Sequence, residues 1–142
     1  MPEREKEALK EQGDEFIDSG NYKEGFSCYD KALIIDPSYK DAVKAKKEGI
    51  KKIVDGKLQN KTSSEAIKYC REKFNIDIDS SLYFKAIMAY NSGKYDEAIK
   101  YFTEALKMDS EDTDLLTGKG IVLLKQKDIK GSIDCFDRVL AI

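Results

Sequence analysis

The residues best suited to acid–base or metal chemistry in this sequence are carboxylates and cysteines, because histidine is absent. Without histidine, the chain lacks the most common general base and nitrogen ligand of proteins. Among the groups of nearby carboxylates are Asp77 with Asp79, and Asp109 with Glu111 and Asp112. Each group comes at the start of a segment with helical periodicity, where acidic side chains cap the helix and interact favourably with its dipole. We therefore expect helix caps at these positions and not catalytic pairs.

The cysteines and glycines also lack the spacing of a chemical site. Cys28, Cys70 and Cys135 are far apart in the sequence and form no metal-binding or redox pair. Each adjoins an aromatic residue within a helical pattern, which predicts reduced thiols buried as small apolar groups. The glycines match neither common phosphate-binding loop, and the glycines of 118–120 fall inside a helical pattern. The sequence therefore predicts no cofactor, no metal site and no enzymatic activity.

The charge composition limits the classes of partner and the location. The 142 residues include 25 basic and 27 acidic residues, a net charge of −2, which gives no broad cationic surface for nucleic acid or an anionic membrane. No apolar run approaches the ~20 residues that span a bilayer. The N-terminal segment, MPEREKEALKEQ, is too polar for a signal peptide. We therefore expect a soluble, cytoplasmic protein that binds neither nucleic acid nor membranes.

The elements that position these residues are repeated helical units. Residues 19–33 (SGNYKEGFSCYDKAL) and 92–106 (SGKYDEAIKYFTEAL) agree at serine, glycine, tyrosine, glutamate, alanine and leucine, and weaker copies occur at 65–70 and 125–140. Repetition of this kind indicates stacked helical hairpins. In each unit a small residue precedes a large aromatic residue by four positions, which lets two helix faces interdigitate closely.

The repeated positions resemble the tetratricopeptide repeat family, whose pattern places apolar residues and glycine in a first helix, then alanine and an aromatic residue in a second. The first repeat carries the pattern at Leu9, Gly13, Phe16, Tyr22, Gly25, Tyr29, Ala32 and Pro37. The third carries it at Leu82, Ala86, Ala89, Tyr95, Ala98, Phe102 and Ala105. The fourth carries it at Leu116, Gly120, Leu123, Ile129, Ser132, Phe136 and Val139. The resemblance implies an all-α fold, a right-handed superhelix of antiparallel helix hairpins, or α-solenoid.

We expect one domain over residues 1–142, with an irregular second repeat. The approximate repeats are 6–39, 40–78, 79–112 and 113–142. In the second, the polar segment 55–64 is about seven residues longer than the turn of the family and is expected to be a loop. Ser63 or Ser64 is expected to cap a helix that begins at Glu65. The loop is either a functional element or an exposed tip that tolerates insertion.

The resemblance implies a non-catalytic protein–protein interaction scaffold. In this family the first helices of successive repeats line a concave groove that holds a segment of a partner. On helical spacing, the expected groove residues are Lys10, Asp14, Lys44, Lys51, Tyr83, Ile87, Tyr90, Asn91, Ile121 and Lys125. We expect a protein or peptide partner that is partly apolar, with acidic residues facing the four lysines.

One binding mode of the family does not fit these residues. Some members hold the C-terminal carboxylate of heat-shock chaperones with a clamp of lysine, asparagine and arginine side chains. Lys10 fits the first clamp position, but Asp14 and Ala45 replace the two asparagines. Because a carboxylate repels another carboxylate, we expect no clamp of this kind.

Two alternatives to peptide binding stay open. No polar capping helix follows Phe136, so either the natural protein continues beyond Ile142 or this face pairs with another copy as a homodimer. The expected self-association face consists of Ile133, Phe136, Leu140 and Ile142. The other alternative is that the chain is a regulatory part of a larger protein.

Overall fold

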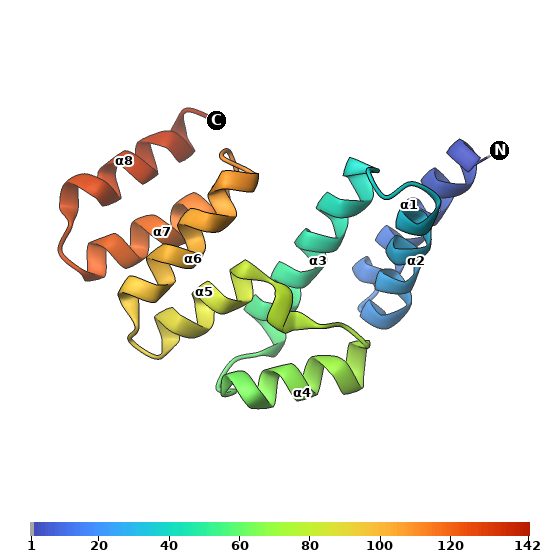
Figure 1. The fold of residues 1–142 in the computed structure, drawn as a ribbon, viewed down its shortest axis with the longest axis horizontal. Helices are drawn as coiled ribbons and strands as arrows, with labels where there is room; N and C mark the ends of the chain where they lie inside the picture. Colours follow the sequence, from blue (N-terminus) through green and yellow to red (C-terminus); the bar gives the residue numbers. More distant parts are fainter. Residues whose placement is uncertain (1) are drawn as a thin grey trace. The chain divides into compact units, whose positions relative to one another are not determined.

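The computed structural model describes residues 2–142, and within them it contains eight α-helices and no strand. The helices are α1 (Pro2–Asp18), α2 (Tyr22–Ile35), α3 (Lys40–Lys57), α4 (Ser63–Phe74), α5 (Leu82–Asn91), α6 (Tyr95–Met108), α7 (Thr113–Lys125) and α8 (Ile129–Leu140), with a 3-10 turn at Ile78–Ser80 (Figure 1). The predicted all-α fold is confirmed. The chain divides into two compact units, Met1–Ile78 and Asp79–Ile142, which we describe separately.

In the first unit, α1 and α2 form a hairpin whose helices touch through glycine. A Cβ atom on Gly13 would lie 2.5 Å from Cε1 of Tyr29, and one on Gly25 would lie 2.6 Å from Cδ1 of Ile17. Each glycine therefore gives a large side chain of the other helix room to pack at core density. The hairpin turns at Gly20, whose φ of 84° is a left-handed conformation that glycine adopts without steric cost, as expected for the end of α1.

The third and fourth helices extend this unit differently from each other. Helix α3 packs against α2 and α1, and the ring of Phe26 lies over Gly49, where a Cβ atom would be 3.0 Å from the ring. Helix α4 packs against α2 through Phe74, whose ring centroid lies 5.3 Å from that of Tyr22. Within residues 40–78, the fourth helix therefore lies against α2.

The connection between α3 and α4 corrects the expected loop at 55–64. Helix α3 continues to Lys57 because the next residue, Leu58, is 1% exposed and anchors the helix end in the core. Helix α4 begins two residues earlier than expected and is capped by Thr62. The Thr62 hydroxyl accepts a hydrogen bond from the Glu65 amide, and the Glu65 carboxylate accepts one from the Thr62 amide, both at 3.2 Å. This reciprocal capping box satisfies two helix-terminal donors.

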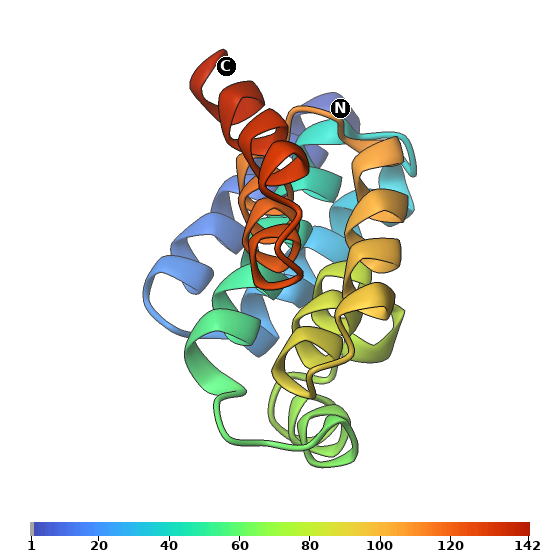
Figure 2. The same cartoon turned by 90° about the vertical axis from the view of Figure 1, so that its left-hand side faces the viewer.

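The second unit repeats the hairpin construction. One buried apolar cluster of this unit consists of Ala86, Ala89, Ala98, Phe102, Leu106, Leu115, Leu116 and Val122. The ring of Phe102 on α6 lies over Gly118 of α7, and the ring of Phe136 on α8 lies over Gly120. Added Cβ atoms would lie 2.6 Å and 2.8 Å from these rings. Helices α5 and α6 therefore pair, and α7 packs against both α6 and α8, as the two views show (Figures 1 and 2; Figure 2 turns the molecule by 90°).

A charged cluster ties the start of α1 to the end of α2. The Lys6 ammonium, on a side chain that is 10% exposed, lies 2.7 Å from the Asp36 carboxylate and 4.8 Å from the centroid of the Tyr39 ring. Hydrogen bonds to Asp36 first, and to Glu3 second, raise the pKa of Lys6. Hydrogen bonds from Lys6 and then from Ser38 lower the pKa of Asp36. The cluster therefore stabilises the folded hairpin while both groups are charged.

Substitution of Gly13 tests the glycine contact between α1 and α2. We expect Gly13→Ala to lower the free energy of unfolding by about 1–3 kcal/mol, because the new methyl group overlaps the Tyr29 ring. The control is Gly56→Ala in α3, where no atom lies within 4 Å of the new Cβ. That substitution should raise the stability by about 0.5–1 kcal/mol through helix propensity. Urea denaturation followed by circular dichroism measures both, and equal effects would contradict the packing argument.

Acid titration of stability tests the Lys6–Asp36 cluster. Because the pKa of Asp36 is lower in the folded chain than in the unfolded chain, its contribution is present above about pH 4 and is lost as the pH falls through the lowered value. We expect Asp36→Asn to remove this part of the acid dependence. Thermal unfolding between about pH 2 and pH 6 measures it. Glu11→Gln, at an exposed carboxylate of α1 outside the cluster, should retain the wild-type profile.

Candidate functional site

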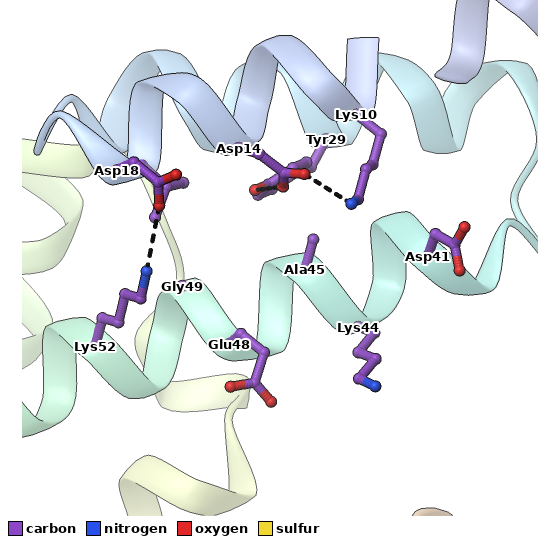
Figure 3. A pocket seen from close by; sticks show the side chains of 11 residues that line it. Lys10, Asp14, Asp18, Tyr29, Asp41, Lys44, Ala45, Glu48, Gly49 and Lys52 are labelled. Carbon is purple, nitrogen blue, oxygen red and sulfur yellow. Dashed lines mark hydrogen bonds and ion pairs between the residues drawn. The ribbon is translucent and has the colours of Figure 1, made fainter. Parts of the chain in front are cut away.

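A pocket of about 520 Å³ lies in the first unit, between α1 and α3, with Tyr29 of α2 in its wall (Figure 3). Its lining consists of Lys10, Asp14, Ile17, Asp18, Tyr29, Asp41, Lys44, Ala45, Glu48, Gly49 and Lys52. Three residues predicted for the groove are therefore brought together here: Lys10, Asp14 and Lys44. Ala45 also lines the pocket. Asp14 and Ala45, which replace the two asparagines of the carboxylate clamp, therefore both lie beside Lys10.

The pocket exists because α3 presents small residues to α1. Ala45 and Gly49 are four residues apart and share one face of the helix. Figure 3 shows Ala45 pointing towards α1 and Asp14. Ile17, which is 5% exposed, supplies an apolar surface at the base. The result is a cleft with a small apolar floor, open to a side chain from outside.

A hydrogen-bonded chain of three side chains forms one wall. The Tyr29 hydroxyl donates to Oδ1 of Asp14 at 2.6 Å, and the Lys10 ammonium lies 2.7 Å from Oδ2 of the same carboxylate (Figure 3). Burial, with the hydrogen bond to Asp14 second, raises the pKa of Tyr29. The hydrogen bond to Asp14 also raises the pKa of Lys10. Both oxygens of Asp14 are therefore engaged within the chain, and the positive charge of Lys10 is balanced.

The remaining charges of the pocket lie at its rim. The Lys52 ammonium of α3 lies 3.6 Å from the Asp18 carboxylate of α1, which links the two helices beside the pocket. Figure 3 shows Lys44 and Glu48 pointing away from α1, on the open side. Counted over the whole lining, four carboxylates face three ammonium groups. The rim is therefore mixed in charge and does not select strongly for acidic ligands.

Lys51, which the sequence places in the groove, does not line this pocket. Its side chain is 8% exposed and its ammonium lies 3.3 Å from the Glu48 carboxylate. The reason is helical geometry: each residue advances the helix by about 100°, so two residues beyond Gly49 the side chain points away from α1. The expected contact between Lys51 and an acidic partner residue is therefore not supported by its position.

The predicted groove residues of the second unit divide into two groups. Tyr83, Ile87 and Tyr90 are half-buried and pack against the core of their unit. The Tyr83 ring lies 6.5 Å from that of Phe102, and the Tyr90 ring lies 5.7 Å from that of Tyr95. These aromatic side chains therefore already contribute to packing within the unit. The exposed members are Asn91, Ile121 and Lys125.

The expected self-association face lies on α8 and the residues after it. Leu140 is 84% exposed, Ile142 is 59% exposed and Ile133 is 50% exposed. Phe136 is half-buried because its ring covers Gly120. Leu124 and Ile129, which the sequence did not assign to this face, are 50% and 53% exposed. Their equivalents in the preceding repeat are Tyr90 and Tyr95.

The cysteine thiols, which could in principle react or bind a metal, are used in packing. All three cysteines are buried free thiols, as predicted, and burial raises their pKa values, that of Cys70 to about 11. Within residues 2–142, no group of three or more cysteine or carboxylate side chains is placed to hold a metal ion. Over the same residues, none of the helices combines the length and apolar character needed to span a bilayer.

Removal of the Tyr29 hydroxyl tests the hydrogen bond to Asp14 in the pocket wall. We expect Tyr29→Phe to lower the free energy of unfolding by about 0.5–1.5 kcal/mol, because Asp14 loses a hydrogen-bond donor. Since the pKa of Tyr29 is raised on folding, this contribution is present below about pH 10 and is lost as the pH rises further. Urea denaturation at neutral pH measures the loss. Tyr101→Phe, at a half-buried ring beside Lys85, is the control and should change stability by less than about 0.5 kcal/mol.

Comparison with known proteins agrees with the hairpin construction. Residues 85–142 match the model of the tetratricopeptide repeat family, and no curated protein matches the chain. Two solved structures are similar to it, a MamA RS-1 ArsTM double mutant and MamA 41-end from Desulfovibrio magneticus RS-1. Each is 19% identical and covers 96% of this chain and 74% of its own, with TM-scores of 0.49 and 0.48 respectively. The tetratricopeptide repeat pattern is thus matched by residues 85–142 of the second unit, and a glycine-based hairpin of the same kind is present in the first unit.

Proposed function

We propose that this chain is a non-catalytic scaffold that holds a segment of a partner protein in the pocket between α1 and α3. The observation that carries the proposal is the space above Ala45, floored by Ile17 and bordered by charged side chains. A small apolar side chain of the partner fits against this floor. Its burial supplies the main gain in binding free energy, because apolar anchors in desolvated pockets dominate interface energetics.

The charged rim favours a partner segment with residues of both signs. Lys44 is available to an acidic residue, and Asp41 lies one turn before it on α3 for a basic one. Lys10 already has Asp14 as its carboxylate partner, which leaves less affinity for a second carboxylate. Exposed ion pairs add about 0–1 kcal/mol each, so these contacts orient the segment more than they bind it.

The class of partner follows from the same charges. The chain as a whole carries 25 basic and 27 acidic residues, and the pocket lining is also mixed. A nucleic acid would require a continuous cationic surface to replace its counterions. A protein segment is the partner that suits mixed charges around an apolar floor, and the proposal includes a cytoplasmic location.

Filling the pocket tests the proposal. Peptides selected from a random displayed library on the wild-type chain are synthesised, and their affinities are measured by fluorescence anisotropy. We expect Ala45→Trp to weaken binding at least about tenfold, because the new side chain occupies the floor. The matched control is Lys47→Trp, at an exposed position of α3 outside the lining, which should bind as the wild type does.

Two further measurements make the result specific. Circular dichroism confirms that both tryptophan variants are folded. Lys44→Glu should reverse the preference of the selected peptides from acidic to basic residues at the contacting position. If the peptides bind Ala45→Trp as tightly as the wild type, the pocket is not the binding site and the proposal is wrong.

A further inference from the structure

An exposed apolar face on the last two helices carries a second inference, independent of the pocket. Within residues 2–142, six of the eight exposed large apolar side chains fall between residues 121 and 142. The α7–α8 face consists of Ile121, Leu124, Ile129, Ile133, Phe136 and Leu140. Exposed apolar side chains that gather on two neighbouring helices commonly mark an interaction site.

The internal repeat shows what kind of structure covers such a face. Each residue of the α7–α8 face follows its equivalent in α5–α6 by 34 residues, the period of the repeat, as Ile121 follows Ile87. The six equivalents are Ile87, Tyr90, Tyr95, Ile99, Phe102 and Leu106. All six belong to, or pack against, the core that α7 completes with Leu115, Leu116 and Val122. The same positions are therefore covered by a helix in one repeat, whereas in the next repeat five are exposed and Phe136 is half-buried.

Helix α7 also shows which types of residue a helix needs in order to pack against such a face. Where α7 meets α6, Gly118 lies beneath the Phe102 ring, and a Cβ atom there would be 2.6 Å from the ring. At the other end of the contact, the Gln126 amide donates a hydrogen bond to the Asp96 carboxylate at 2.7 Å. The equivalent of Asp96 on α8 is Lys130, which is exposed. The side chain at this position is therefore negatively charged in the third repeat and positively charged in the fourth.

We propose that the α7–α8 face docks an amphipathic helix of a partner protein, with a glycine or alanine opposite Phe136 and an acidic residue opposite Lys130. The small residue gives the exposed edge of the Phe136 ring the close approach that Gly118 gives Phe102. Apolar residues of the partner helix cover Ile133 and Leu140, as α7 covers their equivalents. The carboxylate takes the place of Gln126 and pairs with the lysine.

A second copy of this chain fits the face less well. Its α8 exposes large side chains at Ile133 and Leu140, so two such helices would place large residues opposite large ones. Its α1 is polar at the required positions: alignment of the repeats places Glu11 and Glu15 where α7 has Gly118 and a buried valine. Burying those carboxylates against an apolar face would be costly. The observations therefore favour a different protein as the source of the helix.

A peptide copy of α7 provides the probe. The peptide has the sequence of residues 112–126 with Gln126→Glu, and it carries a hydrocarbon staple on its polar side because short isolated helices are marginally stable in water. It is titrated against the full chain by fluorescence anisotropy. We expect Leu140→Asp in the chain to weaken binding at least about tenfold, because the charge faces an apolar surface. The matched control is Ile34→Asp on α2, since Ile34 is 79% exposed and lies outside the face.

The small residue and the charge are tested separately. A peptide with Gly118→Leu should lose binding to the wild-type chain. Lys130→Glu in the chain should weaken binding of the Gln126→Glu peptide, and a Gln126→Lys peptide should restore it. Circular dichroism confirms that the chain variants are folded, which the 84% exposure of Leu140 favours.

Three outcomes would overturn the proposal. In the first, the peptide does not bind the wild-type chain. In the second, it binds the Leu140→Asp chain equally well, which would mean that it replaces α7 or binds elsewhere. In the third, sedimentation shows a dimer that Leu140→Asp dissociates, which would make a second copy the occupant. Failure of the peptide leaves the pocket of the first unit unaffected, because the two sites share no residue.

Discussion

The fold depends on close contact between a glycine on one helix and an aromatic ring on another. The Gly13–Tyr29 contact sets the α1–α2 hairpin, and the contacts of Phe102 and Phe136 with glycines of α7 set the second unit. At these points the ring occupies the volume that a Cβ atom would need, so the helices interdigitate at the density of a protein core. The residues that make the repeats visible in the sequence are therefore committed to packing, and they leave function to positions where the repeats differ.

The two proposed binding surfaces are places where this contact is incomplete. At the pocket, α3 presents the small residue Ala45 towards α1, and no aromatic ring fills the space above it. On α8 the situation is the reverse, because Ile133 and Leu140 are present without a helix that carries small residues opposite them. A partner would complete each contact in the way that the chain completes it elsewhere. One principle of packing thus accounts for the stability of the hairpins and for the shape of both surfaces.

The parts of the structure that could be predicted are those governed by nearby residues. The periodicity of apolar and small positions identified the hairpins, and Gly20 marked a left-handed turn because few other residues adopt that conformation. The end of α3 was not predictable from the polar composition of 55–64, because it is set by burial of Leu58, which is 1% exposed in the folded chain. The position of Lys51 outside the pocket lining depends on the rotation of α3, which is fixed by contacts of Gly49 with the neighbouring helices.

The hydrogen bond between Tyr29 and Asp14 explains why this pocket differs from a carboxylate clamp. A buried tyrosine needs a partner for its hydroxyl, and Asp14 supplies one while its second oxygen pairs with Lys10. An asparagine at this position would leave Lys10 with an unbalanced charge for an incoming carboxylate, whereas Asp14 neutralises it. The carboxylate therefore serves the fold through Tyr29 and changes the ligand preference through Lys10. In the function proposed above, recognition in this pocket would consequently rest on its shape and apolar floor, with Lys44 and Asp41 at the rim to orient the bound segment.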